Sequence, residues 1–324
     1  MNHPHYQHLA GIFEAYLAEH QPRGTPDSLY EPMRYINNLG GKRIRPVLVL
    51  MAYNLWHPDV APALPAALAI EYFHNFSLMH DDIMDEAPLR RGKESVHTHF
   101  DRNAAILAGD SLLIKSFELL IDLEQRYRLG SSVALVMAKT SLEICEGQQM
   151  DIDFETRTSP SEDEYVEMIR KKTACLLGAC LRIGSMIAGA HSDVSNSLYA
   201  YGENLGLAFQ IKDDTLDVFG DPELTGKQKG GDILQGKKNF LYVCALNTLP
   251  ESDKENFINS YSNVTSDQGI SKVIELYRSM GIEDYAREKQ KHYFERAMSS
   301  LHNIKGVDTS MLKSFAEELV KREH

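Results

Sequence analysis

The sequence contains little cysteine and no long apolar run. Its four cysteines form no CxxC pair, which argues against a paired-cysteine metal or redox motif. Cys175 and Cys180 lie in the apolar run TACLLGAC, so we expect them to be small core residues. No stretch approaches the ~18 apolar residues of a membrane span, and the N-terminus lacks the basic and apolar segments of a signal peptide. We therefore expect a protein of the reducing cytoplasm without a transmembrane segment.

Positive charge is also scarce. The 324 residues include 46 acidic and only 34 basic ones, which gives a net charge of −12. A general nucleic-acid binder would show a basic face, so we expect no nucleic-acid partner. The chain is 43% hydrophobic and 25% charged, which is typical of a globular protein with a large core.

Alternating patterns typical of β-strands are missing as well. Apolar residues instead recur at three- and four-residue spacing, which predicts helices. The expected helices span 64–86, 104–124, 131–150, 162–190, 194–219, 235–248 and 268–301. Breaker clusters at 39–46, 157–163 and 220–232 separate some of them, and there is no linker or repeat. We therefore expect one all-α domain over residues 1–324, a helical bundle with a deep central cavity.

A cluster of carboxylates is present at 81–85, where the sequence reads DDIMD. Asp81 and Asp85 are four residues apart, so they lie on one face of a helix and repel each other unless a cation binds between them. Carboxylate oxygens suit a hard ion such as Mg²⁺. By itself, this motif is better explained as a solvated acidic helix end.

The same spacing recurs at 213–217, where the sequence reads DDTLD. Each cluster lies at the C-terminal end of a long apolar helix. The helix dipole favours cations there, so carboxylates at this position are unfavourable. Such a local conflict is typical of functional sites. The two clusters, which could face each other across a bundle, together favour metal binding.

Basic residues accompany both acidic clusters. Arginine forks match phosphate oxygens and lysine supplies a point charge. Carboxylates that hold Mg²⁺, together with these basic groups, predict a bound diphosphate. The residues concerned are Lys42, Arg43, Arg45, Arg90, Arg91, Lys172, Lys227, Lys229, Lys237 and Lys238.

The motifs and their order resemble those of the trans-isoprenyl diphosphate synthases, the polyprenyl synthetase family. The resemblance covers roughly residues 35–245 of the chain. It rests on GGKRIRP at 40–46, DDIMD at 81–85, RRG at 90–92, LAGD at 107–110, EGQQMD at 146–151, KT at 172–173, FQIKDDTLD at 209–217, and GK at 226–227 and 236–237.

The resemblance implies a helical bundle of the isoprenoid synthase type and a homodimer. It also implies Mg²⁺-dependent condensation of isopentenyl diphosphate with an allylic diphosphate, with three ions bridging the allylic diphosphate. The implied metal ligands are Asp81, Asp82, Asp85, Asp213 and Asp217. The residues implied for isopentenyl diphosphate are Lys42, Arg45, His74 and Arg91, and those for the allylic diphosphate are Arg90, Lys172, Lys227 and Lys237. Thr173 and Gln210 would line the region where the allylic cation forms.

In the resembling family, bulk at the fourth and fifth residues before the first motif limits product length. Here these residues are the small Ser77 and the aromatic Phe76, and Phe73 lies one turn below. This combination favours a C20 product, geranylgeranyl diphosphate, with C15 farnesyl diphosphate as the close second.

Three other interpretations compete. A class I terpene cyclase also uses DDxxD, but it needs no isopentenyl diphosphate site and its second motif usually differs. A non-catalytic regulatory subunit would tend to lose one aspartate motif, and both are intact. A ferritin-like di-iron site is suggested by ExxH at Glu71–His74 and at Glu94–His97, but Pro88 and Gly92 predict a loop around Glu94.

Overall fold

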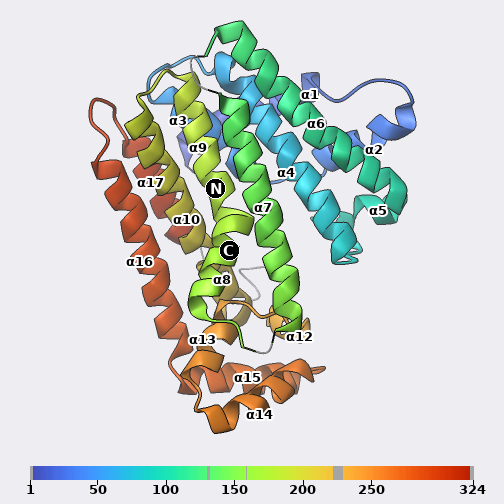
Figure 1. Ribbon diagram of the computed structural model, residues 1–324, viewed down its shortest axis with the longest axis vertical. Coiled ribbons are helices and arrows are strands. Elements are labelled where there is room, and N and C mark those ends of the chain that lie inside the picture. Colours follow the sequence, from blue (N-terminus) through green and yellow to red (C-terminus); the bar gives the residue numbers. More distant parts are fainter. Residues whose placement is uncertain (1–2, 130–131, 158, 222–228, 322–324) are drawn as a thin grey trace. The chain divides into compact units, whose positions relative to one another are not determined.

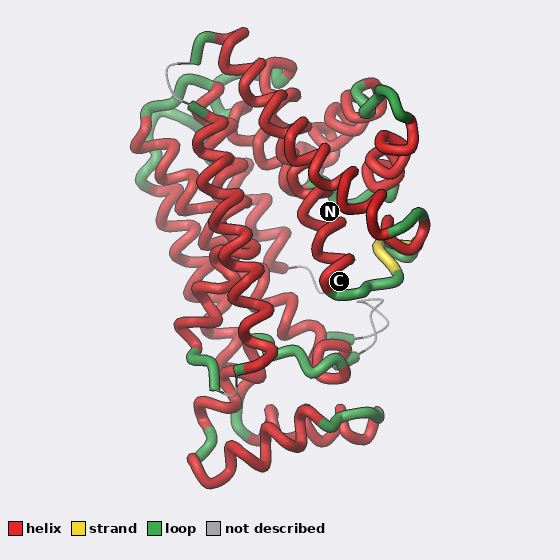
Figure 2. Tube along the Cα trace, turned by 45° about the vertical axis from the view of Figure 1, so that its right-hand side comes forward, coloured by secondary structure: helices red, strands yellow, loops and turns green. Residues whose placement is uncertain are grey.

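The computed structural model describes residues 3–129, 132–157, 159–221 and 229–321 (Figure 1). Over these residues the chain is almost entirely helical, and its strands form one short hairpin (Figure 2). The all-α prediction is therefore confirmed. The helices of the first half are α1 (Pro4–Glu19), α2 (Asp27–Asn38), α3 (Ile44–Asn54), η1 (Ala61–Ala63), α4 (Leu64–Met84), α5 (Val96–His99), α6 (Arg102–Tyr127) and α7 (Val133–Thr156). The strands β1 (Leu89–Arg90) and β2 (Lys93–Glu94) pair antiparallel.

In the described part of the second half, every regular element is a helix. Its elements are α8 (Glu162–Ile169), the π-helical turn η2 (Arg170–Ala174), α9 (Cys175–Ile187), α10 (Ser192–Phe219), α12 (Gly231–Leu234), α13 (Phe240–Thr248), α14 (Glu251–Ser262), α15 (Asp267–Ser279), α16 (Ile282–His302) and α17 (Ser310–Lys321).

Two differences from the expected helices have local causes. The predicted helix over 162–190 contains the π-helical turn between α8 and α9. The predicted helix over 268–301 is interrupted at Gly281, which adopts φ 69° before the first residue of α16. Glycine enters this left-handed region at little cost, and one such residue leaves the apolar spacing on both sides intact. Periodicity alone therefore could not reveal the break.

The chain divides into two compact units. The first comprises Met1–Ala138, Ala179–Leu198 and Gly306–Leu312, and the second comprises Lys139–Gly178, Tyr199–Lys305 and Lys313–His324. The helices α7, α9 and α10 each contribute residues to both units. That the whole chain is one domain around a central cavity stays a prediction.

In the first unit, α4 and α6 lie side by side (Figure 1). Alanines on α4 such as Ala66 and Ala69 are fully buried. Gly109 on α6 meets the ring of His80, because an added Cβ there would lie 2.6 Å from His80 Cδ2. The glycine of the LAGD motif thus permits the two helices to approach closely.

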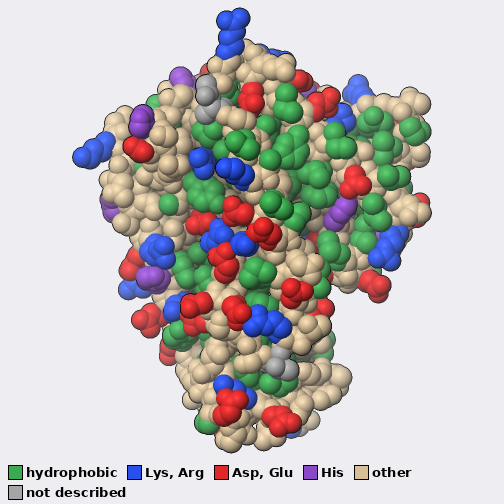
Figure 3. All heavy atoms as spheres, in the orientation of Figure 1, with side chains coloured by type: hydrophobic (Ala, Val, Ile, Leu, Met, Phe, Trp, Pro, Cys, Tyr) green, Lys and Arg blue, Asp and Glu red, His purple; other side chains and the backbone are tan. Residues whose placement is uncertain are grey.

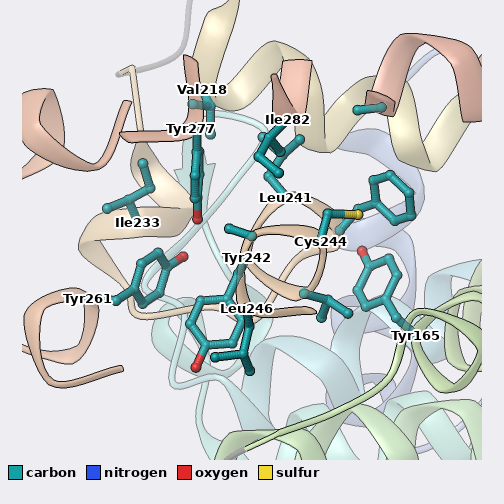
Figure 4. Packing of buried hydrophobic residues seen from close by; sticks show 14 of the residues in the cluster. Tyr165, Val218, Ile233, Leu241, Tyr242, Cys244, Leu246, Tyr261, Tyr277 and Ile282 are labelled. Atoms are coloured by element: carbon teal, nitrogen blue, oxygen red, sulfur yellow. The ribbon is translucent and has the colours of Figure 1, made fainter. Parts of the chain in front are cut away.

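In the second unit, α13 forms the centre of the core (Figure 4). All residues from Phe240 to Leu246 are buried, and the ring of Tyr242 lies 4.6 Å from that of Tyr261, between centroids. The Tyr261 hydroxyl donates to the carbonyl of Lys237 at 2.6 Å. The core therefore fixes the backbone next to a predicted diphosphate-binding lysine.

Cys175 and Cys180 lie in the core, as expected. Cys175, Cys180 and Cys244 are buried, and Cys145 is exposed. Burial raises the pKa of Cys180 to about 12, which keeps this thiol protonated and unreactive. No helix in the described part of the chain is long and apolar enough to cross a membrane.

Candidate functional site

The first aspartate motif lies at the C-terminal end of α4. Asp81 is partly exposed, and Asp85 is exposed and caps the helix, with its N–H donating to the Asp81 carbonyl at 2.9 Å. Asp82 is only 1% exposed. The outer carboxylates therefore lie nearer to solvent, and the second carboxylate is turned inward.

Asp82 forms an ion pair with Arg90 of the hairpin. Arg90 Nε donates to Asp82 Oδ1 at 2.9 Å and to Oδ2 at 3.2 Å. Burial raises the pKa of Asp82, although the Arg90 guanidinium opposes this shift. In this structure Asp82 and Arg90 thus pair with each other. The contact of Asp82 to metal and that of Arg90 to diphosphate stay predictions.

The second motif, in α10, repeats this arrangement. Asp213 and Asp217 are partly exposed, whereas Asp214 is 4% exposed. Asp214 accepts hydrogen bonds from the Tyr165 hydroxyl, from Phe240 N at 3.0 Å and from Gln210 Nε2 at 3.0 Å. Burial raises the pKa of Asp214 to about 7, and these three donors oppose the shift.

Asp217 also has a structural contact. Its Oδ2 accepts from Asp232 N at 3.0 Å, at the N-terminal end of α12, and its carbonyl accepts from Gly230 N at 2.7 Å. Gly230 and Asp232, at the start of α12, are therefore hydrogen-bonded to the motif itself. The two motifs belong to different units, and the expectation that they face each other stays a prediction.

The carboxylates fit magnesium that is shared with a substrate. Among the described residues, no three His, Cys, Asp or Glu side chains gather closely enough to hold an ion by themselves. Magnesium is usually bound by one or two carboxylates together with waters and substrate phosphates. The outer pairs Asp81 with Asp85 and Asp213 with Asp217 match that pattern.

Several predicted isopentenyl diphosphate residues lie together in the first unit. Arg45 Nη1 lies 3.1 Å from His74 Nε2, so the nitrogen of a neutral imidazole accepts from the guanidinium. Burial lowers the pKa of His74 well below its ordinary value, and the nearby charges of Arg45 and Arg91 lower it further. The imidazole therefore stays neutral near pH 7 within a group of cations.

The RRG hairpin lies against the GGKRIRP loop. Arg91 and Gly92 form its turn, at φ 54° and 76°. Arg91 Nη1 donates to the Gly40 carbonyl, and a Cβ added to Gly41 would lie 2.6 Å from Arg91 Cζ. The hairpin thereby brings Arg91 to the loop that carries Lys42, whose side chain is exposed.

Lys172 and Thr173 lie in the π-helical turn η2. Single π-turns inside α-helices often occur at functional sites. Lys172 Nζ donates to Asp151, the last residue of EGQQMD, and an added Cβ on Gly147 would lie 2.3 Å from Lys172 N. The glycine of that motif therefore permits α7 to pass directly against the turn.

The two adjacent lysines after α12 have different roles. Lys238 Nζ donates to the carbonyls of Phe154 and Glu155 at 2.9 and 3.0 Å, at the C-terminal end of α7. Lys237 is exposed, as a diphosphate contact requires. The third predicted lysine of this region, Lys227, lies outside the described residues.

The chain-length residues lie on α4. Phe73 is 1% exposed, and its ring centroid lies 5.6 Å from that of the partly exposed Phe76. Phe76 in turn lies 4.7 Å from the His80 ring. The Ser77 hydroxyl donates to the His74 carbonyl at 2.8 Å.

Sequence reasoning missed the roles of the buried residues Asp214 and Tyr165 and of the partly exposed Asp151. The DDxxD pattern cannot distinguish its second aspartate from the others, because the inward turn depends on residues distant in sequence. Asp151 had a signal, since it ends the EGQQMD motif that carries the resemblance.

The di-iron interpretation does not hold. Glu71 forms an ion pair with Arg43. Glu94 lies in the strand β2, where the sequence predicted a loop, and therefore not in a helix. The ExxH pattern of ferritin-like sites requires both glutamates on helices.

A family model described as Polyprenyl synthetase matches residues 26–280. The chain is 39% identical over 312 residues to the geranylgeranyl pyrophosphate synthase of Geoglobus acetivorans, an alignment that covers 96% of this chain and 95% of that protein.

Solved structures agree with this match. The crystal structure of a geranylgeranyl pyrophosphate synthase has a TM-score of 0.90 at 37% identity and covers 98% of this chain and 99% of that one. A geranylgeranyl pyrophosphate synthase from Corynebacterium glutamicum, complexed with isoprenyl diphosphate and magnesium, has a TM-score of 0.78 at 27% identity and covers 98% and 97%. The motifs, the helical fold and these similarities together show that the chain belongs to the polyprenyl synthetase family and is a prenyltransferase.

Proposed function

We propose that the enzyme catalyses the Mg²⁺-dependent head-to-tail condensation of isopentenyl diphosphate with allylic diphosphates, with all-trans C20 geranylgeranyl diphosphate as its main product. The observation that carries this proposal is the pair of aspartate motifs, each with its outer carboxylates towards solvent, together with the group formed by Arg45, His74 and Arg91. The magnesium and isoprenyl diphosphate named for the Corynebacterium glutamicum structure support the same chemistry.

The proposed reaction assigns separate tasks to these groups. Arg45, His74 and Arg91 bind the diphosphate of isopentenyl diphosphate, whereas Lys172 and Lys237 contact the allylic diphosphate. Magnesium held by the outer aspartates would neutralise charge on the departing diphosphate. Thr173 and Gln210 line the place where the allylic cation forms, and apolar helices keep water from quenching it.

The double bond of isopentenyl diphosphate attacks the allylic cation and forms the new carbon–carbon bond. The cation formed by this attack then loses a proton, which the released diphosphate takes up. The neutral His74 supports binding of a phosphate oxygen only if its other nitrogen carries the proton, since Nε2 accepts from Arg45.

The decisive experiment supplies purified enzyme with isopentenyl diphosphate and one allylic primer at a time, and measures products by mass spectrometry. We expect diphosphate release only when Mg²⁺ and both substrates are present, and a C20 diphosphate as the main product. Cyclic hydrocarbons formed without isopentenyl diphosphate would identify a terpene cyclase. Activity that appears only with a second, different chain would identify a regulatory subunit.

We also propose a homodimer, formed through the exposed apolar side chains of α6. Leu107, Ile114 and Ile121 recur every seven residues and are 58, 67 and 44% exposed. Figure 3 shows hydrophobic side chains gathered over the surface that α6 forms. A seven-residue repeat matches the packing of one helix on another, so a second copy of this chain would bury the row. Sedimentation equilibrium should give twice the chain mass of 36.6 kDa, and a mass near one chain would refute the dimer.

A further inference from the structure

Arg43 lies in the middle of the GGKRIRP loop, yet its side chain is buried, unlike that of the neighbouring Lys42. Its side chain is 3% exposed, and its backbone adopts φ 49°, a left-handed conformation that is uncommon for residues other than glycine. The neighbouring Lys42 is exposed. From the sequence alone, Arg43 belongs to the basic residues expected near a diphosphate, but the family resemblance implies no substrate contact for it.

The Arg43 guanidinium joins three helices. Nε donates to Glu14 Oε1 of α1 at 2.7 Å, and Nη2 donates to the Asn37 carbonyl of α2 at 2.7 Å. Nη1 donates to Glu71 of α4, whose carboxylate is buried with it. Burial lowers the pKa of Arg43, but the carboxylates of Glu71 and Glu14 outweigh this effect and raise the pKa above its ordinary value.

The polar network continues behind the arginine. Asn75 Nδ2 donates to Asn37 Oδ1 at 2.8 Å, and Asn37 Nδ2 donates to Gln21 Oε1 at 3.1 Å. Both asparagines are fully buried. A buried ion pair contributes little net stability compared with apolar residues of the same size. This network is therefore better explained by the geometry that it imposes on the loop.

That geometry bears directly on the isopentenyl diphosphate residues. Glu71 and His74 are three residues apart on α4, so they lie on one face of the helix. Glu71 binds Arg43, and His74 binds Arg45, two residues further along the same segment. Two adjacent contacts thus hold the loop against α4. One is the buried ion pair of Arg43 with Glu71, and the other joins the predicted substrate residues Arg45 and His74.

We propose that Arg43, held by Glu71 and Glu14, is a positioning residue that fixes Lys42 and Arg45 for the diphosphate of isopentenyl diphosphate. This proposal rests on the proposed function. A fixed guanidinium anchor lets Lys42 and Arg45 bind the diphosphate without first becoming ordered, which improves binding of that substrate. The allylic diphosphate, assigned to other residues, should be affected little.

Two variants test the proposal at different strengths. Arg43→Lys keeps the charge but loses the planar fork, so it cannot satisfy Glu71, Glu14 and the Asn37 carbonyl in the same geometry. Glu14→Gln removes the charge of the half-exposed partner alone and leaves the buried pair intact. If Arg43→Lys fails to fold, Glu14→Gln decides the question.

The matched control is Arg34→Lys. Arg34 lies on α2, pairs with Asp27 at 2.6 Å and donates to the Pro22 carbonyl at 3.1 Å. The variant Arg34→Lys therefore alters an ion pair and a carbonyl contact of an arginine in the same unit, but none of the contacts of the GGKRIRP loop.

The measurements are KM for each substrate, kcat, and the Kd of isopentenyl diphosphate by calorimetry. We expect KM and Kd for isopentenyl diphosphate to rise about tenfold in Arg43→Lys and a few-fold in Glu14→Gln, the size of one weakened charge-assisted contact. In both variants, the allylic KM and kcat should stay within about twofold of those of the unmodified enzyme. In the control Arg34→Lys, all of these constants should stay within about twofold. Equal rises for both substrates, or a fall in kcat with an unchanged KM, would overturn the proposal.

The calorimetry separates this proposal from the proposed function. If the unmodified enzyme binds isopentenyl diphosphate but forms no prenyl product, the reaction is wrong and the positioning role is still tested by the Kd. If binding is normal in both variants, Arg43 does not position the loop, whatever the product.

Discussion

Asp81→Ala and Asp213→Ala should each lower kcat by at least about 10²-fold, the typical loss when one electrostatic stabiliser of a transition state is removed. Each residue is the first aspartate of its motif and is partly exposed. By helical spacing it shares a face with the aspartate four residues later. Removing one of several clustered carboxylates relieves repulsion between like charges, so both variants should fold. Turnover in each is measured with saturating substrates over a Mg²⁺ titration.

The structure supplies two controls for this comparison. Asp122→Ala removes an exposed carboxylate of α6 and should leave both turnover and stability unchanged. Asp82→Ala instead leaves Arg90 without its buried partner, which should cost about 1–3 kcal/mol of folding free energy and lower the melting temperature. Near-normal turnover in Asp81→Ala or Asp213→Ala would mean that these aspartates do not bind catalytic metal.

The difference between Asp81 and Asp82 illustrates what the sequence could and could not predict. Helical spacing places Asp81 and Asp85 on one face, and the structure agrees. The inward turn of Asp82 depends on Arg90, which arrives through a hairpin whose strands are only two residues long. No alternating pattern of useful length marks such strands, so neither the hairpin nor the ion pair was predictable.

The same reasoning applies to the lysines. Charge and position alone do not distinguish Lys237 from Lys238, and only the family resemblance, through GK at 236–237, selects Lys237 as a substrate contact. Only the fold shows that Lys238 binds the carbonyls at the end of α7 while Lys237 remains exposed. Spacing along a helix is a local property and can be inferred from sequence. The partner of a long side chain is a non-local property and cannot.

Changes at Ser77 and Phe76 should replace the main product with one of different length. A growing prenyl tail that runs along α4 from Asp81 towards the helix N-terminus meets Ser77 ~6 Å and Phe73 ~12 Å below the aspartate, at 1.5 Å per residue. Ser77→Phe should plug the upper part of this path and shift the main product from C20 to C15. Phe76→Ala should remove the floor and lengthen the product by at least one five-carbon unit.

The surroundings of Phe76 explain why it can act as a floor. Its ring lies between those of Phe73 and His80, at 5.6 and 4.7 Å between centroids, and a Cβ on Gly109 of α6 would lie 3.6 Å from its Cδ2. The neighbouring rings and α6 limit how far this ring can swing aside, so added tail length meets a supported wall. An alanine in its place opens a space that the close-packed neighbours fill only in part.

Each substitution has a control that separates length from general damage. Ser77→Ala removes the hydroxyl that donates to His74 but adds no bulk, so its product should stay C20. Phe13→Ala removes a fully buried ring of α1 in the same unit, so it should lower stability without changing carbon number. Products are measured by mass spectrometry with dimethylallyl diphosphate as primer and excess isopentenyl diphosphate, so that both C15 and C20 products can form. If Ser77→Phe and Phe76→Ala both turn over and both give the carbon number of the unmodified enzyme, this face of α4 does not set the product length. The reason is that a ring added or removed beside the tail would change the space available to it.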